Sequence, residues 1–144
     1  MEQKMELIVR ALIIRDRKIL VCQTAGRDYF FLPGGHVEFS ETLYSALRRE
    51  LYEEMGAILK GAEFIGGVEN MFNQEDLQKH EISFVFQSEI DLQIIKSREE
   101  NLSFYWFTID EFIEANIAPA ALKDAILQWT AEKDPFFIEE GRNQ

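Results

Sequence analysis

Residues 35–57, GHVEFSETLYSALRRELYEEMGA, say more about this chain than any other stretch of it. Leucines recur every four residues over positions 43–51, which is the spacing of an apolar face on an amphipathic helix. Gly56 stands where this pattern stops, and glycine favours the backbone conformation that ends a helix. Ser40 is of a residue type that caps helix starts. We therefore predict a helix that begins after Ser40 and runs to about Met55.

The polar face of this helix carries a concentration of acid. Residues three and four apart project from the same face of a helix, so Glu50, Glu53 and Glu54 lie together. Like charges this close repel one another unless a cation binds among them. Carboxylate oxygens suit Mg²⁺ or Mn²⁺ better than Zn²⁺. The pattern therefore predicts a divalent metal site on the helix.

The alternative is an ordinary charged helix on the protein surface. That alternative does not explain why the acids and the arginines at 48–49 are interleaved with leucines. It also leaves unexplained the glycines on both sides of the helix, which include those of the Pro-Gly-Gly turn at residues 33–35.

The pattern resembles the signature box of the Nudix hydrolases, in which a glycine and a glutamate precede Arg-Glu-aliphatic-x-Glu-Glu-x-Gly-aliphatic at fixed spacings. Here Gly35 and Glu41 precede residues 49–57, RELYEEMGA, and every charged and glycine position of the box is present. The one departure is Ala57, where a larger aliphatic residue is usual, and it affects packing and not chemistry. The resemblance covers nearly the whole chain and is sharp only between Phe31 and Ala57.

The resemblance implies an α/β fold of the Nudix type, an α/β/α sandwich with a mixed β-sheet. It implies hydrolysis of a nucleoside diphosphate linked to another moiety, with cleavage in the diphosphate and Mg²⁺ or Mn²⁺ as cofactor. The second candidate is a nucleotide-binding or sensor module of the same fold without catalysis. Loss of box acids would favour that module, and none is lost. ADP-ribose, dinucleotides, oxidised nucleoside triphosphates and sugar nucleotides stay open as substrates, because loops outside the box set specificity.

The resemblance also implies roles for the box residues. Glu50 and Glu54 lie about one helical turn apart, and we expect them to be the first metal ligands. Glu53 is expected to bind a second ion or to act as the general base. Gly34 occupies the position that supplies a backbone carbonyl ligand in related proteins.

Arg49 has a local partner for its charge in Glu41. We expect an ion pair between them that ties the preceding loop to the helix and orients the acids. The alternative role for Arg49 is phosphate binding.

Members of the family often take their general base from outside the box, in a loop ahead of a late strand. Glu99 and Glu100 stand in such a place, just before an apolar run at residues 102–107. Glu81 is a third candidate. For each of these acids the alternative is an ordinary surface charge.

Contacts to the substrate are predicted from residues around the variable loops. The candidates are Arg27, His36, Phe72, His80 and Glu81. Arg27 could equally be a solvated loop residue, and core packing is the alternative for Phe72. His36 is expected to contact substrate, because as a zinc ligand it lacks partners in the sequence.

The remaining elements follow from period-two patterns and turn residues. Strands are predicted at residues 7–14, 18–23, 30–32, 59–68, 82–90 and 102–107. The first of these is apolar on both faces and should be the central strand. Residues 73–79 are predicted as a polar loop. Thr108 opens a capping-box pattern for a short helix, and Pro119 begins the last helix. Residues 134–144 are predicted to form a tail, anchored if its two phenylalanines find an apolar surface.

Composition limits the remaining interpretation. The chain has 144 residues, of which 47% are hydrophobic, and this fits one domain over residues 1–144. A formal net charge of −11 argues against nucleic-acid binding, which needs a basic surface. It does not argue against a phosphorylated substrate, because metal ions reverse the sign of an acidic site. Cys22 is the single cysteine and is expected to be a buried thiol.

Targeting signals are not visible in the sequence. Residues 1–6 are polar and lack the apolar core of a signal peptide. No apolar stretch approaches the roughly 20 residues needed to span a bilayer. We therefore expect a cytoplasmic protein without a membrane partner. Dimers are common in the family, so a homodimer is compatible with the sequence, although nothing in the chain requires it.

Overall fold

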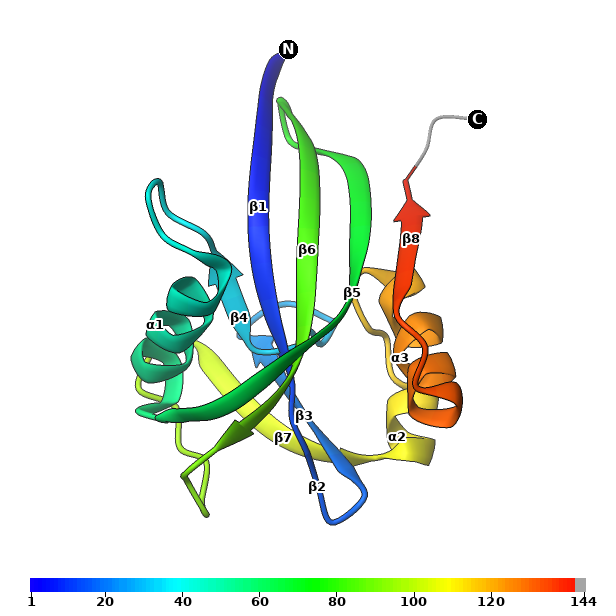
Figure 1. Ribbon diagram of the computed structural model, residues 1–144. Helices are drawn as coiled ribbons and strands as arrows, with labels where there is room; N and C mark the ends of the chain where they lie inside the picture. Colours follow the sequence, from blue (N-terminus) through cyan, green and yellow to red (C-terminus); the bar gives the residue numbers. More distant parts are fainter. Residues whose placement is uncertain (142–144) are drawn as a thin grey trace.

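The chain folds into β-sheets with helices on both sides. Figure 1 shows this arrangement in a computed structural model, in which residues 1–141 are described. The strands are β1 (Glu2–Leu12), β2 (Ile14–Arg15), β3 (Lys18–Thr24), β4 (Gly34–His36), β5 (Leu59–Gln74), β6 (Leu77–Ile90), β7 (Leu102–Thr108) and β8 (Phe136–Glu140). The helices are α1 (Leu43–Met55), α2 (Ile109–Glu114) and α3 (Ala120–Glu132). In residues 1–141 the helices are too short or too polar to cross a lipid bilayer.

The large sheet has the strand order β4-β1-β6-β5-β8 and is mixed. β1 runs parallel to β6 and antiparallel to β4, while β5 runs antiparallel to β6 and parallel to β8. A smaller antiparallel sheet has the order β2-β3-β7. The mixed sheet expected from the sequence is present. The second sheet arises because the chain leaves the large sheet after Leu12 and enters the small one at Ile14.

The predicted α/β/α layering is confirmed by the two apolar clusters on opposite faces of β1. Val9 and Ala11 pack with the leucines of α1, whereas Leu12 packs with α2 and α3. Successive side chains of a strand point to opposite faces, so both faces of β1 are covered in this region. The strand predicted at residues 7–14 is therefore central, as expected.

Cys22 is buried, as the sequence predicted, and burial raises the pKa of its thiol.

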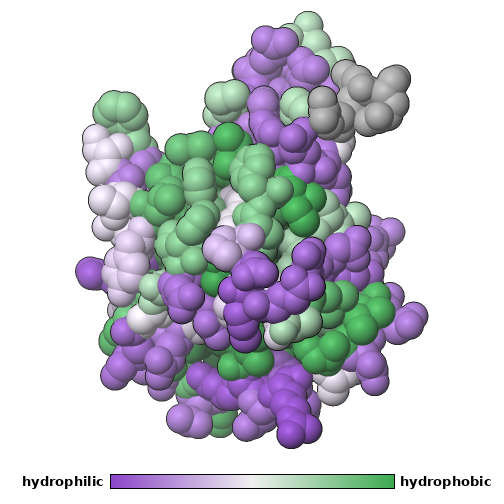
Figure 2. Space-filling view, turned by 45° about the vertical axis from the view of Figure 1, so that its right-hand side comes forward, coloured by the Kyte–Doolittle hydropathy of each residue, from purple (hydrophilic) through white to green (hydrophobic). Residues whose placement is uncertain are grey.

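Part of the face that carries α1 stays uncovered. Met5 and Leu7 of β1 and Phe137 of β8 point to this face and are 68%, 43% and 61% exposed. Figure 2 shows hydrophobic side chains gathered over this part of the large sheet. This apolar area contrasts with the charged surface around it.

Several elements follow the sequence closely. The strands predicted at residues 18–23 and 102–107 are β3 and β7, each one residue longer. The predicted capping box is present at the start of α2, where the Thr108 hydroxyl accepts a hydrogen bond from the Glu111 N–H at 3.1 Å. Pro119 is the residue before α3.

The loop predicted at residues 73–79 is wrong. β5 and β6 continue through it as a hairpin, with Asn73 opposite Gln78, and only Glu75 and Asp76 form the turn. Glu75 has a positive φ of 57°, which suits a tight turn. Backbone pairing does not need apolar side chains, so a polar sequence can prolong a hairpin into solvent.

The tail predicted at residues 134–144 is also corrected. β8 adds to the edge of the large sheet beside β5, and Phe136 packs into the cluster beneath α3, while Phe137 does not. A Cβ at Gly66 would lie 2.5 Å from the Phe136 carbonyl oxygen, so the glycine permits this close approach. Residues 142–144 of the predicted tail lie outside the described part of the chain.

The segment before α1 differs from its prediction as well. The glycines of the Pro-Gly-Gly turn belong to β4, which pairs with β1. Instead of a strand at residues 30–32, single bridges join Phe31 to Cys22 and Phe30 to Ile117. A short edge strand with two glycines has few side chains that could signal it in the sequence.

Candidate active site

Helix α1 begins later than the sequence predicted. Thr42 is the N-cap, and its hydroxyl accepts a hydrogen bond from the Ser45 backbone N–H at 3.1 Å. Ser40, the predicted cap, has a φ of +70° in the preceding turn. The Glu41 carboxylate holds this turn by accepting a hydrogen bond from the Glu38 N–H at 2.9 Å, and this places Ser40 outside the helix.

The predicted end of α1 is confirmed. Gly56 has a φ of +71°, and its N–H donates to the Tyr52 carbonyl at 2.8 Å. Leu47 and Leu51 are fully buried against the sheet. The helix is thus fixed by both its ends and its apolar face, which leaves the charged face directed toward β4.

The glycines of β4 pack directly on the carboxylates of α1. The Gly34 N–H donates to Glu54 Oε1 at 3.1 Å. A Cβ at Gly35 would lie 2.4 Å from Glu50 Oε2. A Cβ at Gly34, where φ is +142°, would lie 1.9 Å from the Val9 carbonyl oxygen. Gly34 is required because its added Cβ would meet backbone, whereas an added Cβ at Gly35 would displace the Glu50 side chain.

Arg49 lies at the centre of the charged face. Its Nε and Nη2 donate to the two Glu41 oxygens at 2.7 and 2.9 Å, and the predicted ion pair is therefore present. Nη1 donates to Glu50 and Glu53, both at 2.9 Å, and Nη2 also donates to the His36 carbonyl at 2.9 Å. A guanidinium has five N–H groups, and here each has an acceptor. Arg49 also holds the pKa of Glu41 down at about 2.

The two innermost carboxylates are costly to ionise in the absence of a cation. Glu54 is 4% exposed, and burial raises its pKa to about 8 despite the opposing effect of Arg10. Burial also raises the pKa of Glu50, although Arg49 opposes it. A divalent cation among these oxygens would favour their ionised forms. The donor set therefore fits a hard metal ion.

Glu99, in the late loop, is an acid whose charge reaches the box. Its charge is among those that raise the pKa of Glu50 and of Glu54, and both Glu99 and Glu100 are exposed. The loop is tied to α1 because the Arg98 N–H donates to the Glu54 carbonyl at 2.8 Å. This attachment explains how a residue so distant in sequence lies beside the helix.

Arg10 is a site residue that the sequence did not reveal. Its Nη1 donates to the Leu32 carbonyl at 3.0 Å, and its guanidinium lies 5.4 Å from the centre of the Phe31 ring. Its charge lowers the pKa of Glu54. The available signal was an arginine inside an otherwise apolar strand, where a charge needs a partner.

The predicted substrate contacts do not all lie together. His36 and Glu81 lie on the same face of the large sheet, and Phe72 shares that face one register step beyond Glu81. His80 points to the opposite face, where its Nε2 lies 2.6 Å from Glu69 Oε2. Alternation along β6 separates His80 from Glu81, which adjacency in sequence had placed together.

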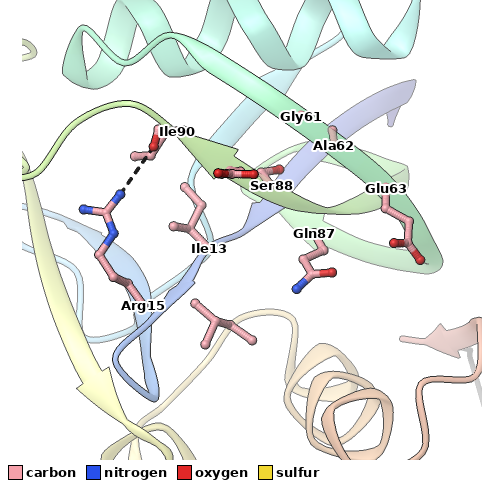
Figure 3. A pocket seen from close by; sticks show the side chains of 10 residues that line it. Ile13, Arg15, Gly61, Ala62, Glu63, Gln87, Ser88 and Ile90 are labelled. Carbon is pink, nitrogen blue, oxygen red and sulfur yellow. Dashed lines mark hydrogen bonds between the residues drawn. The ribbon is translucent and has the colours of Figure 1, made fainter.

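Arg27 and one of the surface pockets lie apart from the box. Arg27 is exposed in the turn after β3. Figure 3 shows a pocket of about 460 Å³ between β2 and the ends of β5 and β6, lined by none of the box residues. Its only arginine, Arg15, donates to the Ile90 carbonyl at 3.5 Å and lies over Trp106. Because this guanidinium already has partners, we do not assign the pocket to substrate.

Known proteins share the sequence pattern and the fold of this chain. The model of the NUDIX domain family matches residues 5–129. The crystal structure of the MutT protein from Bacillus halodurans has a TM-score of 0.77 and 21% identity, covering 94% of this chain and 89% of that one. The MutT NUDIX hydrolase from Burkholderia pseudomallei has a TM-score of 0.73 and 23% identity, covering 87% and 98%. At these identities the likeness shows the fold.

A curated relative shares part of the sequence. It is the ADP-ribose pyrophosphatase of Methanocaldococcus jannaschii, 37% identical over 81 residues that make up 54% of this chain. The match covers 47% of the relative, so this chain spans about half of that protein's length.

Proposed function

This chain belongs to the NUDIX domain family, and from that membership we propose that it hydrolyses a nucleoside diphosphate linked to another moiety, using Mg²⁺ or Mn²⁺. The observation that carries the proposal is the convergence of Glu50 and Glu54 on the two glycines of β4. Such carboxylates, of which Glu54 is buried and Glu50 partly buried, are good ligands for a small divalent cation. The complete box favours catalysis over the sensor module.

The metal would be held by Glu50 and Glu54, with Glu53 and the Gly34 carbonyl as further ligands. When bound, it would neutralise phosphate oxygens and lower the pKa of a coordinated water. Arg49 would keep the carboxylates oriented, since its contacts to Glu41 and the acids fill its donors.

We propose Glu99 as the general base. Its position beside Glu50 and Glu54 would allow it to accept the proton of the attacking water. Glu53 and Glu81 are the remaining alternatives. Glu99 is preferred to Glu100 because its charge is among those that raise the pKa of Glu50 and Glu54.

ADP-ribose is the first substrate that we propose, because the curated relative is named for it. Phe72 is our candidate for stacking on the base, since it lies on the sheet face that also carries Arg10. We further propose that residues 1–144 act as one domain in the cytoplasm. A homodimer stays a prediction that analytical ultracentrifugation would test.

The deciding experiment is a substrate panel with ADP-ribose, a dinucleotide, an oxidised nucleoside triphosphate and a sugar nucleotide. Phosphate would be measured after phosphatase treatment of the products, with Mg²⁺ and with EDTA. We expect Mg²⁺-dependent turnover of at least one compound and none in a Glu50→Gln, Glu54→Gln double variant. Tight binding of a nucleotide without turnover would favour the sensor module. Full activity in EDTA would contradict the metal requirement.

A further inference from the structure

A second cluster of metal-ligating side chains lies outside the box. Glu6 of β1 lies opposite Glu81 of β6, and His36 of β4 lies opposite Ile8, two residues along β1 on the same face. The possible ligand atoms of Glu6, His36 and Glu81 all lie within 4.8 Å of one another. His36 Nε2 and Glu6 Oε2 are in direct contact as an ion pair. Three adjacent strands therefore present one imidazole and two carboxylates to one point.

Glu6 is buried without its full set of partners. Its side chain is only 8% exposed, and within residues 1–141 its Oε1 has no hydrogen-bond partner. Lys79 Nζ lies 3.5 Å from Oε1, close enough for an ion pair but without hydrogen-bond geometry. A buried carboxylate oxygen without a partner costs free energy, and a bound cation would remove that cost.

Glu81 adds a second carboxylate to this charge. Burial raises the pKa of Glu81, while Lys79 and Arg10 lower it and Glu6 raises it. The positive groups thus offset part of the repulsion between the two acids. Lys79 and Arg10 have long, flexible side chains. Glu6, His36 and Glu81 are held near one another by the pairing of β1, β4 and β6.

We propose that Glu6, His36 and Glu81 bind a divalent transition-metal ion, with Zn²⁺ as the best fit, at a site separate from the box. Zn²⁺ commonly takes three ligands of imidazole and carboxylate type and keeps a fourth position for water. Mg²⁺ prefers oxygen ligands alone, so the imidazole favours the softer ion. Zinc bonds of about 2.0–2.2 Å would draw the ligand atoms together by rotation of the glutamate side chains.

In this assignment His36 and Glu81 are metal ligands, while the substrate contact expected for them from the sequence stays a prediction. It also corrects the expectation that His36 lacks partners for zinc. Those partners are 30 and 45 positions away in sequence and meet His36 only through strand pairing. The site is joined to the box through the His36 carbonyl, which accepts a hydrogen bond from Arg49.

The test is zinc binding by the whole chain in a Glu50→Gln, Glu54→Gln background, which removes binding at the box. Calorimetric titration with Zn²⁺ in excess Mg²⁺ should show one ion per chain. His36→Gln and Glu81→Gln should each weaken binding at least about tenfold. His80→Gln is the matched control, because the chain has two histidines and His80 faces the other side of the sheet. It should bind as the background does.

Two further measurements keep the test independent of folding defects. The His36 side chain is 56% exposed, so His36→Gln should fold even if Glu6→Gln does not. Co²⁺ should give a visible absorption spectrum with an imidazole ligand, and this spectrum should be lost in His36→Gln. Equal Zn²⁺ affinity in His36→Gln and the background would overturn the proposal.

Lys79 provides a variant with the opposite expected sign. Lys79→Met removes the cation that competes for Glu6, so Zn²⁺ should bind several-fold more tightly. Weaker Zn²⁺ binding in Lys79→Met would contradict the proposal, because the loss of a competing cation should not weaken a metal site formed by these carboxylates.

Discussion

Glu99 and Glu100 are adjacent in the late loop, and we propose that only Glu99 is the general base. The charge of Glu99 is among those that raise the pKa of Glu50 and Glu54. Glu→Gln keeps the size of the side chain and removes its charge. Glu99→Gln should therefore lower kcat by about 10²–10⁴-fold, the usual contribution of a general base, without changing the Mg²⁺ requirement. Glu100→Gln should keep kcat within about twofold. Equal losses in the two variants, measured by steady-state kinetics, would remove Glu99 as the base.

Gly35 offers a test of the contact between β4 and the box. An added Cβ would lie 2.4 Å from Glu50 Oε2, the end of a flexible side chain that can move aside. Gly35→Ala should therefore leave stability nearly unchanged but raise the Mg²⁺ concentration for half-maximal activity by roughly 10–100-fold. Gly61→Ala is the control, because a Cβ there meets nothing within 4 Å. An unchanged Mg²⁺ requirement in Gly35→Ala would count against Glu50 as a ligand.

The sequence predicts individual residues well where their partners are local. Arg49 and Glu41 are only eight positions apart, and their pairing ties the turn before α1 to the helix. Arg10 and Glu6 escape prediction because their partners are distant in the sequence. His80 and Glu81 look equivalent in sequence, yet strand alternation sends them to opposite faces. The partners and orientations of these residues depend on which strands pair and in which register, and this pairing cannot be derived from the sequence alone.

At the scale of elements, α1 supplies a test of which residue caps it. The Thr42 hydroxyl accepts the Ser45 N–H, so Thr42→Ala should lower the free energy of unfolding by about 1 kcal/mol. Ser40 makes no such contact in the described chain, and Ser40→Ala should stay within about 0.5 kcal/mol. Urea unfolding of both variants would measure the difference. A larger loss for Ser40→Ala would restore the cap predicted from sequence.

Elements with strong apolar periodicity or cap signals are those that the sequence predicts. α1, α2, α3 and the strands β3 and β7 of the small sheet carry such signals. β4 and β8 were missed because both are short edge strands, stabilised mainly by the strand beside them. The polar end of the β5–β6 hairpin was missed because its pairing is a property of the backbone.

For the whole molecule, the pH dependence of stability and the binding of metal are linked through Glu54. Its pKa is about 8 in the folded protein, against an ordinary value of 4.5. Between these pH values the folded state holds a proton that the unfolded chain has released. The free energy of unfolding of the metal-free protein should therefore fall as pH rises from 4.5 to 8, by at most about 1.4 kcal/mol per pH unit from this group. The stability that the proton supplies is complete below pH 4.5 and lost by about pH 8.

Mg²⁺ should change this pH dependence because it binds the ionised carboxylate in place of the proton. Urea unfolding at pH 6, 7 and 8 would be compared in EDTA and in excess Mg²⁺. We expect the decline in EDTA to be largely removed by Mg²⁺, which stabilises the folded state by mass action at the higher pH values. Glu54→Gln should flatten the curve in EDTA as well, since an amide does not titrate. A decline of the same slope in Glu54→Gln would assign the pH dependence to other groups and would separate Glu54 from the metal site.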